Sequence, residues 1–166
     1  IGPLAAVVAH SFGGAITTLA LARGLEAKAV VLIASPSSIA DVLRRFGELT
    51  GLGNAGMRAF HTAIERQTGV RLADVEIFER VARLQVPALI VHDRGDREVP
   101  FLDAERLAAR WPNATLLATE DVGHRRILKD EDVIRRVVEF VVVATRAVQA
   151  VAPLSNEPRR RADAVP

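Results

Sequence analysis

The sequence predicts an α/β protein with a mostly parallel sheet and flanking helices. Four short apolar runs bounded by turn residues are typical of buried strands; they cover residues 4–9, 27–34, 86–92 and 114–118. Helical stripes, with apolar residues three or four positions apart, separate these runs. A strand, a helix and a further strand in succession form a right-handed crossover, so we expect neighbouring strands to run in the same direction.

Composition and charge fit one globular domain and exclude several classes of protein. The chain has 166 residues, of which 49% are hydrophobic and 25% charged. The charges are dispersed and sum to +2, so we expect no nucleic acid partner, and the absence of cysteine excludes disulfides and thiolate metal sites. No run has the length of a transmembrane helix and no signal segment opens the sequence, so we expect a cytoplasmic protein without membrane contact. Twenty of the 22 basic residues are arginine, which indicates a bacterial, GC-rich genome.

Ser11 lies where the first strand gives way to the first helix, which is predicted over residues 15–22 and ended by Gly24. The turn must be sharp because the helix packs back against its own strand, and Gly13 provides a small residue for that approach. We expect the hydroxyl to face an open cleft, beside helix N–H groups that stabilise a developing negative charge. The alternative is a structural serine that caps the helix.

Residues 38–84 differ from the rest of the sequence, because they show three helical stripes and no strand. They follow the second strand, which ends in the breaker residues 35–38. A segment of this length exceeds an ordinary connection between neighbouring strands, so we interpret it as a helical insertion. Helices that simply cover the sheet are the alternative.

The third strand runs into an acidic loop with three candidate carboxylates, Asp93, Asp96 and Glu98. Any one acid in such a loop is often only a solvated turn residue. An amphipathic helix over residues 101–111 leads to the fourth strand, and a last helix is predicted over residues 130–150.

The chain has four histidines, and only His124 follows a strand end directly behind a glycine. His10 adjoins Ser11, so its side chain is expected to point away from the serine. His61 lies in the helical insertion. His92 ends the third strand, where a histidine is more often satisfied by a neighbour than catalytic. His124 is therefore the candidate base.

Residues 9–13, with the sequence AHSFG, resemble the nucleophile elbow G-x-S-x-G of the α/β-hydrolase superfamily, with alanine at the first glycine. The acidic loop is similar to a superfamily pattern in which a strand ends in His-Gly and an acid and a proline follow. Asp96 matches the acid of that pattern, while Asp93 stands where glycine is usual. The order Ser11, Asp96, His124 is the superfamily's chain order.

The resemblance implies a serine esterase or lipase-like enzyme that forms an acyl-enzyme. Ser11 would attack the acyl carbon, His124 would accept its proton, and Asp96 would orient His124. Asp93 is the second choice for the acid and Glu98 the third. The substrate would be a small-molecule acyl ester or thioester, with no cofactor and no metal.

The backbone N–H of Phe12 would supply one donor of the oxyanion hole, and a loop after an earlier strand would supply the other. Candidates for the substrate pocket are His10, Phe46, Met57 and Phe60. Packing within the insertion explains the last three equally well.

The resemblance divides the chain into a hydrolase core over residues 1–37 and 85–150, a helical cap over residues 38–84, and a disordered tail over residues 151–166. The superfamily's sheet has about eight strands, and the nucleophile follows the fifth, so we expect this sequence to be the C-terminal half. The strand at residues 4–9 would then form an open edge, through which the chain alone self-associates with poor solubility and weak activity.

Two alternatives stay open at this stage. An acyltransferase or a cofactor-free haloperoxidase uses the same three residues with another acceptor for the acyl group. A truncated, hydrolase-like module without catalytic activity belongs to a different class. Serine at position 11 argues against the dehalogenase and epoxide-hydrolase branches, which use aspartate there.

Overall fold

The computed structural model describes residues 4–151, in which four strands form one sheet in the order β1-β2-β3-β4. The strands are β1 (Val7–His10), β2 (Val30–Ile33), β3 (Ala88–Asp93) and β4 (Ala114–Thr119). All neighbouring strands run parallel, which confirms the predicted fold class. β1 begins later than expected, because Leu4 makes only an isolated parallel bridge to Ala27. The predicted disordered tail lies, apart from its first residue, outside the described residues.

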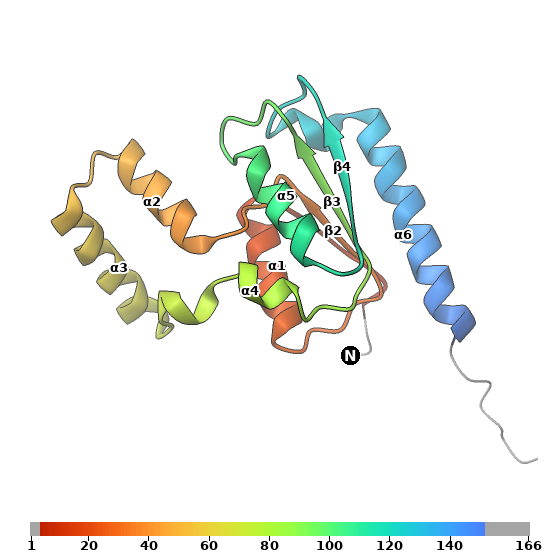
Figure 1. Cartoon of the computed structure of the whole chain (residues 1–166), viewed down its shortest axis with the longest axis horizontal. Coiled ribbons are helices and arrows are strands. Elements are labelled where there is room, and N and C mark those ends of the chain that lie inside the picture. Colours follow the sequence, from red (N-terminus) through yellow and green to blue (C-terminus); the bar gives the residue numbers. More distant parts are fainter. Residues whose placement is uncertain (1–3, 152–166) are drawn as a thin grey trace, which may run out of the picture.

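Helices cover both faces of the sheet (Figure 1). One face carries α1 (Phe12–Ala22), α4 (Phe78–Val81) and α5 (Phe101–Arg110), and the other carries α6 (Glu131–Val151). Side chains alternate along β3, so that Ile90 packs in the core beneath α1 and α5, whereas Val91 packs in the core beneath α6. The two apolar layers leave the carboxyl ends of all four strands at one edge, where ligand sites of parallel sheets form.

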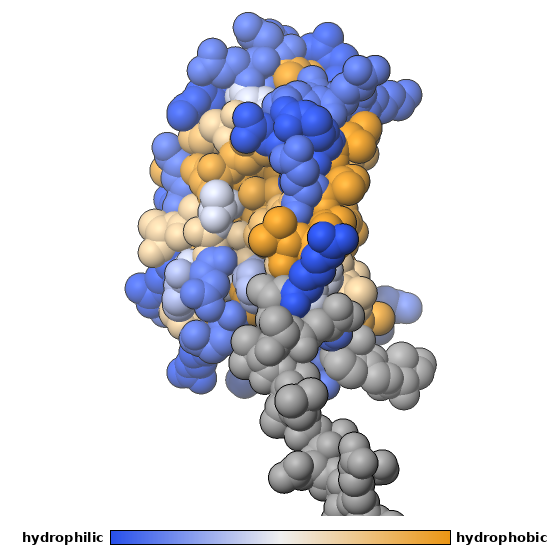
Figure 2. Space-filling model, turned by 90° about the vertical axis from the view of Figure 1, so that its right-hand side faces the viewer, coloured by the Kyte–Doolittle hydropathy of each residue, from blue (hydrophilic) through white to orange (hydrophobic). Residues whose placement is uncertain are grey.

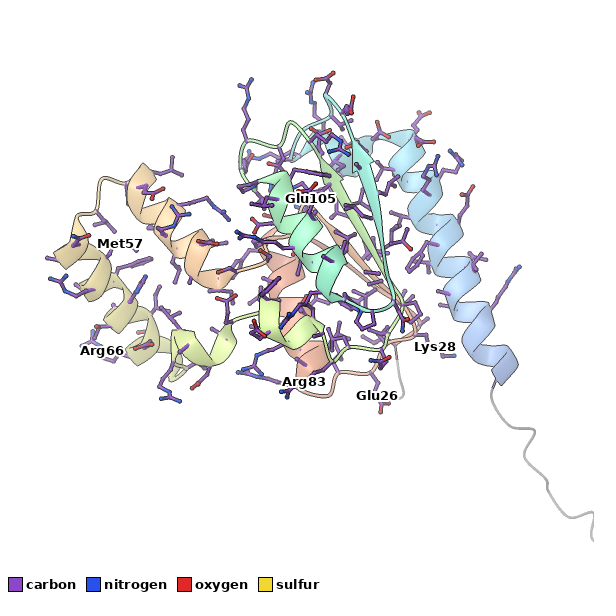
Figure 3. All side chains as sticks on the ribbon, viewed as in Figure 1. Glu26, Lys28, Met57, Arg66, Arg83 and Glu105 are labelled. Atoms are coloured by element: carbon purple, nitrogen blue, oxygen red, sulfur yellow. The ribbon has the colours of Figure 1, made fainter. Side chains whose placement is uncertain are left out.

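Residues 38–84, all of which are described, contain no strand. They form α2 (Ile39–Leu49), α3 (Asn54–Thr68), the 3-10 turn η1 (Leu72–Val75) and α4. Both α2 and α3 extend away from the sheet (Figure 1). Their side chains meet at Gly47 of α2, where the sulfur of Met57, labelled in Figure 3, occupies the space that a Cβ would need, and at the stacked rings of Phe46 and Phe60.

The close approach of α1 to the sheet depends on Gly14, and not on Gly13 as expected. A Cβ on Gly14 would lie 2.6 Å from the Cβ of Ser35, which follows β2. A Cβ on Gly13 would meet no described atom within 4 Å. The turn after Ser11 is closed by a hydrogen bond from the N–H of Gly14 to the carbonyl of Ser11, so the second glycine faces the sheet.

The outer side of α6 is partly apolar. Figure 2 shows this face of the molecule, where hydrophobic surface flanks a polar stripe. The exposed apolar side chains of α6 are Ile134, Val138, Val142 and Val143. No helix within residues 4–151 combines the length and the hydropathy that crossing a membrane requires.

β1 is an edge strand in the described part of the chain, because it pairs only with β2. The N–H groups of Val7 and Ser11 bond to the carbonyls of Ala29 and Ile33, so Val8 turns its backbone groups to the open side. Its side chain is 54% exposed. An apolar, unpaired edge is a template for another chain.

We therefore expect the chain alone to form oligomers through β1, and Val8→Lys to shift it toward monomer, because an edge lysine opposes strand pairing. Size-exclusion chromatography with light scattering measures the change. Leu102→Lys, at an exposed apolar position on α5, is the matched control. Equal molar masses for the wild type and the Val8 variant would contradict an interface at this edge.

Candidate active site

Ser11 sits on a strained turn between β1 and α1. Its backbone has φ 55° and ψ −131°, a positive φ that residues other than glycine rarely adopt. Its side chain makes no capping hydrogen bond to α1, which removes the alternative of a structural cap. The Oγ instead lies 3.0 Å from Nε2 of His124.

His124 is contributed by the loop after β4, where Gly123 has φ 78°. Its side chain is buried, and Nδ1 lies 2.7 Å from Oδ2 of Asp96. Because the carboxylate can only accept, the ring proton lies on Nδ1, and Nε2 accepts the hydroxyl proton of Ser11. A buried base with this tautomer can take a proton from the serine.

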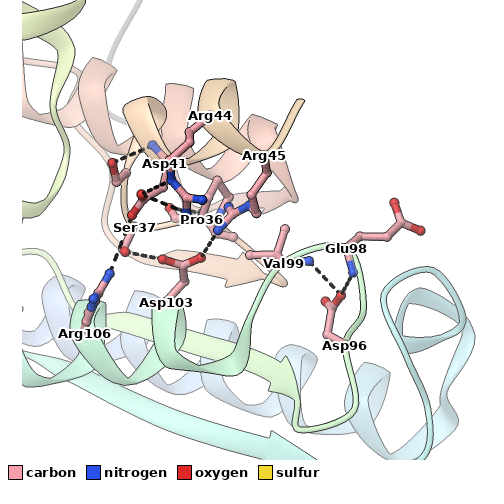
Figure 4. Close-up of polar contacts among 12 residues, drawn as sticks. Pro36, Ser37, Asp41, Arg44, Arg45, Asp96, Glu98, Val99, Asp103 and Arg106 are labelled. Carbon is pink, nitrogen blue, oxygen red and sulfur yellow. Dashed lines mark hydrogen bonds and ion pairs between the residues drawn. The ribbon is translucent and has the colours of Figure 1, made fainter. Parts of the chain in front are cut away.

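Asp96 is fully buried at the side chain and held by backbone groups of its own loop. Its Oδ1 accepts the N–H groups of Glu98 and Val99 at 2.8 and 2.9 Å (Figure 4). This leaves Oδ2 for His124. The loop thus fixes the carboxylate before any substrate binds.

Asp93 points to the other side of the sheet from Asp96. It is the last residue of β3, and alternation places it on the α6 face, after Val91. Burial would raise the pKa of Asp93, but hydrogen bonds from Val122, Thr119, Gly123 and Gly95 outweigh it and lower the pKa below the ordinary value. This carboxylate is bound to the loop after β4 and makes no hydrogen bond to His124 in the described structure.

Asp93→Asn is expected to lower the free energy of unfolding at pH 7 by about 1–3 kcal/mol, because charge-assisted hydrogen bonds are lost. A lowered pKa means that the stabilisation is present above the unfolded-state pKa of about 3.9 and is lost as the pH falls through the folded-state pKa. Urea denaturation of both proteins at pH 7 and pH 3 tests this. The difference in the free energy of unfolding between the two proteins should narrow at pH 3. Equal free energies of unfolding at pH 7 would show that the Asp93 carboxylate does not stabilise the fold.

Glu98, the third candidate acid, is not placed to orient His124. Its Oε2 lies 3.9 Å from Nε2 of His124, on the nitrogen that faces Ser11, and not near Nδ1. Its side chain is 48% exposed and pairs with Arg125 at 3.0 Å.

His10 lies closer to these residues than the sequence suggested. Its Nε2–H donates to the carbonyl of His124 at 2.9 Å, and the two rings lie 4.7 Å apart. His10 does share the α6 face of the sheet with Ile33, its register partner. The loop that carries His124 crosses the end of this face on its way to α6, so the two histidines meet although His10 does not face Ser11.

A cavity of about 780 Å³ opens beside Ser11. Its lining comes from the elbow, the loop after β2, α2, the acidic loop and the loop after β4: Ser11, Phe12, Pro36, Val42, Arg45, Phe46, Glu48, Leu49, Arg97, Glu98, Val99 and His124. Of the predicted pocket residues only Phe46 lines it. Met57 packs against α2, Phe60 stacks on Phe46 with ring centroids 5.3 Å apart, and His10 lies behind His124. The three- and four-residue spacing of Val42, Phe46 and Leu49 is the sequence signal for the α2 wall.

α2 is tied to α5 by a polar network (Figure 4). The hydroxyl of Ser37 donates to Asp103, and Nη1 of Arg45 lies 3.5 Å from the other oxygen of the same buried carboxylate. Arg106 of α5 lies 3.7 Å from Asp41 of α2. These contacts fix the helix that forms one wall of the cavity.

Phe12 begins α1, where the first N–H groups have no acceptor within the helix. Its N–H follows the serine directly and is available to a negatively charged oxygen formed beside Ser11. Among residues 4–151, no group of three or more histidine or acidic side chains is arranged to hold a metal ion. In the described structure the hydroxyl of Ser11 faces the imidazole of His124, and that imidazole faces the carboxylate of Asp96.

No family model matches the chain. A curated relative, the pimeloyl-[acyl-carrier protein] methyl ester esterase of Aromatoleum aromaticum, is 30% identical over 117 residues. The matched region is 62% of this chain and 47% of the relative, so the chain spans about half the length of that protein.

Solved structures share the fold over most of the chain at low sequence identity. A candidate non-heme bromoperoxidase of Mycobacterium tuberculosis has a TM-score of 0.61 and 13% identity, over 84% of this chain and 67% of its own. An α/β hydrolase from a sediment metagenome of the lagoon of Mar Chica has a TM-score of 0.60 and 18% identity, over 83% of this chain and 61% of its own. At these identities the similarity concerns the arrangement of the sheet and helices.

Proposed function

We propose that this chain, which shares its fold with an α/β hydrolase of known structure, carries the catalytic residues of a serine hydrolase that cleaves carboxylic ester or thioester bonds. The observation that carries the proposal is the chain of hydrogen bonds from Ser11 through His124 to Asp96. The curated relative is named an esterase, and we extend ester cleavage, but not its particular substrate, to this chain.

The proposed reaction proceeds through an acyl-enzyme. Ser11 Oγ attacks the acyl carbon while His124 Nε2 takes its proton, and Asp96 stabilises the resulting imidazolium. His124 then gives this proton to the departing alcohol or thiol. Water, activated in turn by His124, releases the acid and regenerates the serine.

The negative charge that forms on the acyl oxygen falls beside the N–H of Phe12. We propose this N–H as one oxyanion-hole donor, and the superfamily pattern assigns a second donor to a loop after an earlier strand.

Product analysis tests the proposed reaction. The full-length gene product is given p-nitrophenyl butyrate and the corresponding thioester, alone and with added alcohol or hydrogen peroxide. A hydrolase releases butyric acid as the main product in every mixture. A transferred acyl group or a peracid as the main product would instead identify an acyltransferase or a haloperoxidase, and no turnover would favour a binding module.

We further propose that residues 38–84 act as a cap, because α2 supplies one wall of the cavity beside Ser11. Phe46→Ala is then expected to raise KM for octanoyl esters roughly tenfold, since the long acyl chain loses an aromatic contact, and to change KM for acetyl esters little. Steady-state kinetics over a series of chain lengths measures this. Leu102→Ala, on α5 and outside the cavity lining, is the control. An unchanged preference for acyl chain length in the Phe46 variant would show that the proposed cap does not select substrates.

A further inference from the structure

His92 is a buried titratable residue that the proposed mechanism does not use. It is the penultimate residue of β3 and is completely buried. Alternation places it on the face of Ile90, beneath α5. There its ring and that of Phe101 are perpendicular, with an interplanar angle of 90° and centroids 5.9 Å apart. A polar ring in such a place is costly unless it makes hydrogen bonds.

The contacts of His92 assign its proton. Nε2 lies 3.0 Å from the carbonyl oxygen of Val99 and 3.3 Å from Oδ2 of Asp96. Both neighbours accept hydrogen bonds, so Nε2 is the nitrogen that carries hydrogen. Nδ1 is buried and has no partner among the described residues, and a proton there would be an unpaired buried donor.

The hydrogen bond from Nε2 of His92 goes to the carbonyl of Val99, and the carboxylate of Asp96 lies beside the same nitrogen. Oδ2 faces Nδ1 of His124 at 2.7 Å and Nε2 of His92 at 3.3 Å, while Oδ1 accepts two backbone N–H groups. Val99 connects the two residues, because its N–H donates to Asp96 and its carbonyl accepts from His92. The carboxylate cannot rotate without breaking several of these bonds at once.

We propose that His92 is a positioning residue: its Nε2–H holds the carbonyl of Val99, and so fixes the loop whose N–H groups keep the carboxylate of Asp96 in the orientation that Nδ1 of His124 requires. This inference rests on the proposed function and names a residue that acts through Asp96, without contact with the substrate. A residue that only fills space at this position would be replaceable by any side chain of similar bulk.

Gln and Met form a matched pair for the test, because they have similar bulk and only Gln keeps an N–H near the position of Nε2. In the full-length protein, His92→Met is expected to lower kcat for p-nitrophenyl acetate about 10- to 100-fold, because a misplaced catalytic group is costly, and to leave KM within about twofold. His92→Gln is expected to retain kcat within about fivefold. His92→Leu provides a second donor-free variant in case the Met variant does not fold.

Two further measurements separate positioning from packing. Proton NMR should show the N–H resonance between His124 and Asp96 in the wild type and the Gln variant, and a shift or loss of that resonance in the Met or Leu variant. In an Asp96→Asn background, His92→Met should lower kcat little further, because its effect passes through Asp96.

The inference is overturned if the Gln and donor-free variants have the same kcat, or if His92→Met costs as much in the Asp96→Asn background as in the wild type. In either case a wild-type enzyme with normal esterase activity leaves the proposed function standing. A wild-type protein that cleaves no ester would instead contradict the proposed function.

Discussion

Replacing Ser11 with alanine is expected to lower kcat for ester hydrolysis by at least about 10³-fold without unfolding the protein. The hydroxyl is the nucleophile of the proposed reaction, and its Oγ lies 3.0 Å from the base. Alanine removes this oxygen and keeps the Cβ that the strained backbone of the elbow already accommodates.

The measurement is kcat for p-nitrophenyl butyrate, together with a thermal unfolding curve. Ser35→Ala is the matched control, because Ser35 is the next serine in the chain and the hydrogen bond of its hydroxyl, at 3.3 Å, goes to the carbonyl of Pro36 and not to His124. Esterase activity near wild type in the Ser11 variant would show that another group carries the reaction.

Asp96→Asn is expected to lower kcat by about 10³- to 10⁴-fold. An asparagine can turn its NH₂ toward His124, where it would favour the tautomer with the proton on Nε2. That tautomer cannot accept the proton of Ser11, although the packing around the side chain is unchanged.

Asp93→Asn, at the end of β3 directly before the loop that carries Asp96, is the matched control and is expected to change kcat far less. Its carboxylate is bound by Thr119 and Val122 on the α6 side. Comparison of kcat for both variants, each shown to be folded, decides between the acids. A larger loss for Asp93→Asn would mean that the wrong acid has been assigned.

The parallel sheet and the proximity of Ser11, Asp96 and His124 were predictable, because both depend on local patterns. Apolar runs mark buried strands, and the carboxyl ends of parallel strands meet at one edge, so residues that follow three strands come together. Ser11, Asp96 and His124 each follow a different strand, and the structure brings them into hydrogen-bonding distance.

Details that depend on the path of the chain after a strand were not predictable in this way. The positive φ of Ser11 turns Gly14 toward β2, although Gly13 belongs to the sequence motif. The contact between His10 and His124 depends on where the loop after β4 crosses the sheet.

Contacts between side chains also could not be predicted from the sequence pattern. Met57 and Phe60 lie in an apolar stripe, and a stripe does not say whether it faces a cavity or a neighbouring helix; here both pack against α2. His92 stands four residues before Asp96, a spacing that carries no contact rule outside a helix. The structure supplies that contact, because the loop after β3 turns back over the strand end.

The most direct test of the account is covalent labelling of the folded, full-length protein with a fluorophosphonate probe, followed by peptide mass spectrometry. A serine activated by His124 reacts through its Oγ, so we expect one adduct, on the peptide that contains Ser11, and its loss in His124→Ala. An unlabelled Ser11 in folded protein, or an adduct at Ser11 that persists in His124→Ala, would contradict the assignment of Ser11 as a nucleophile activated by His124.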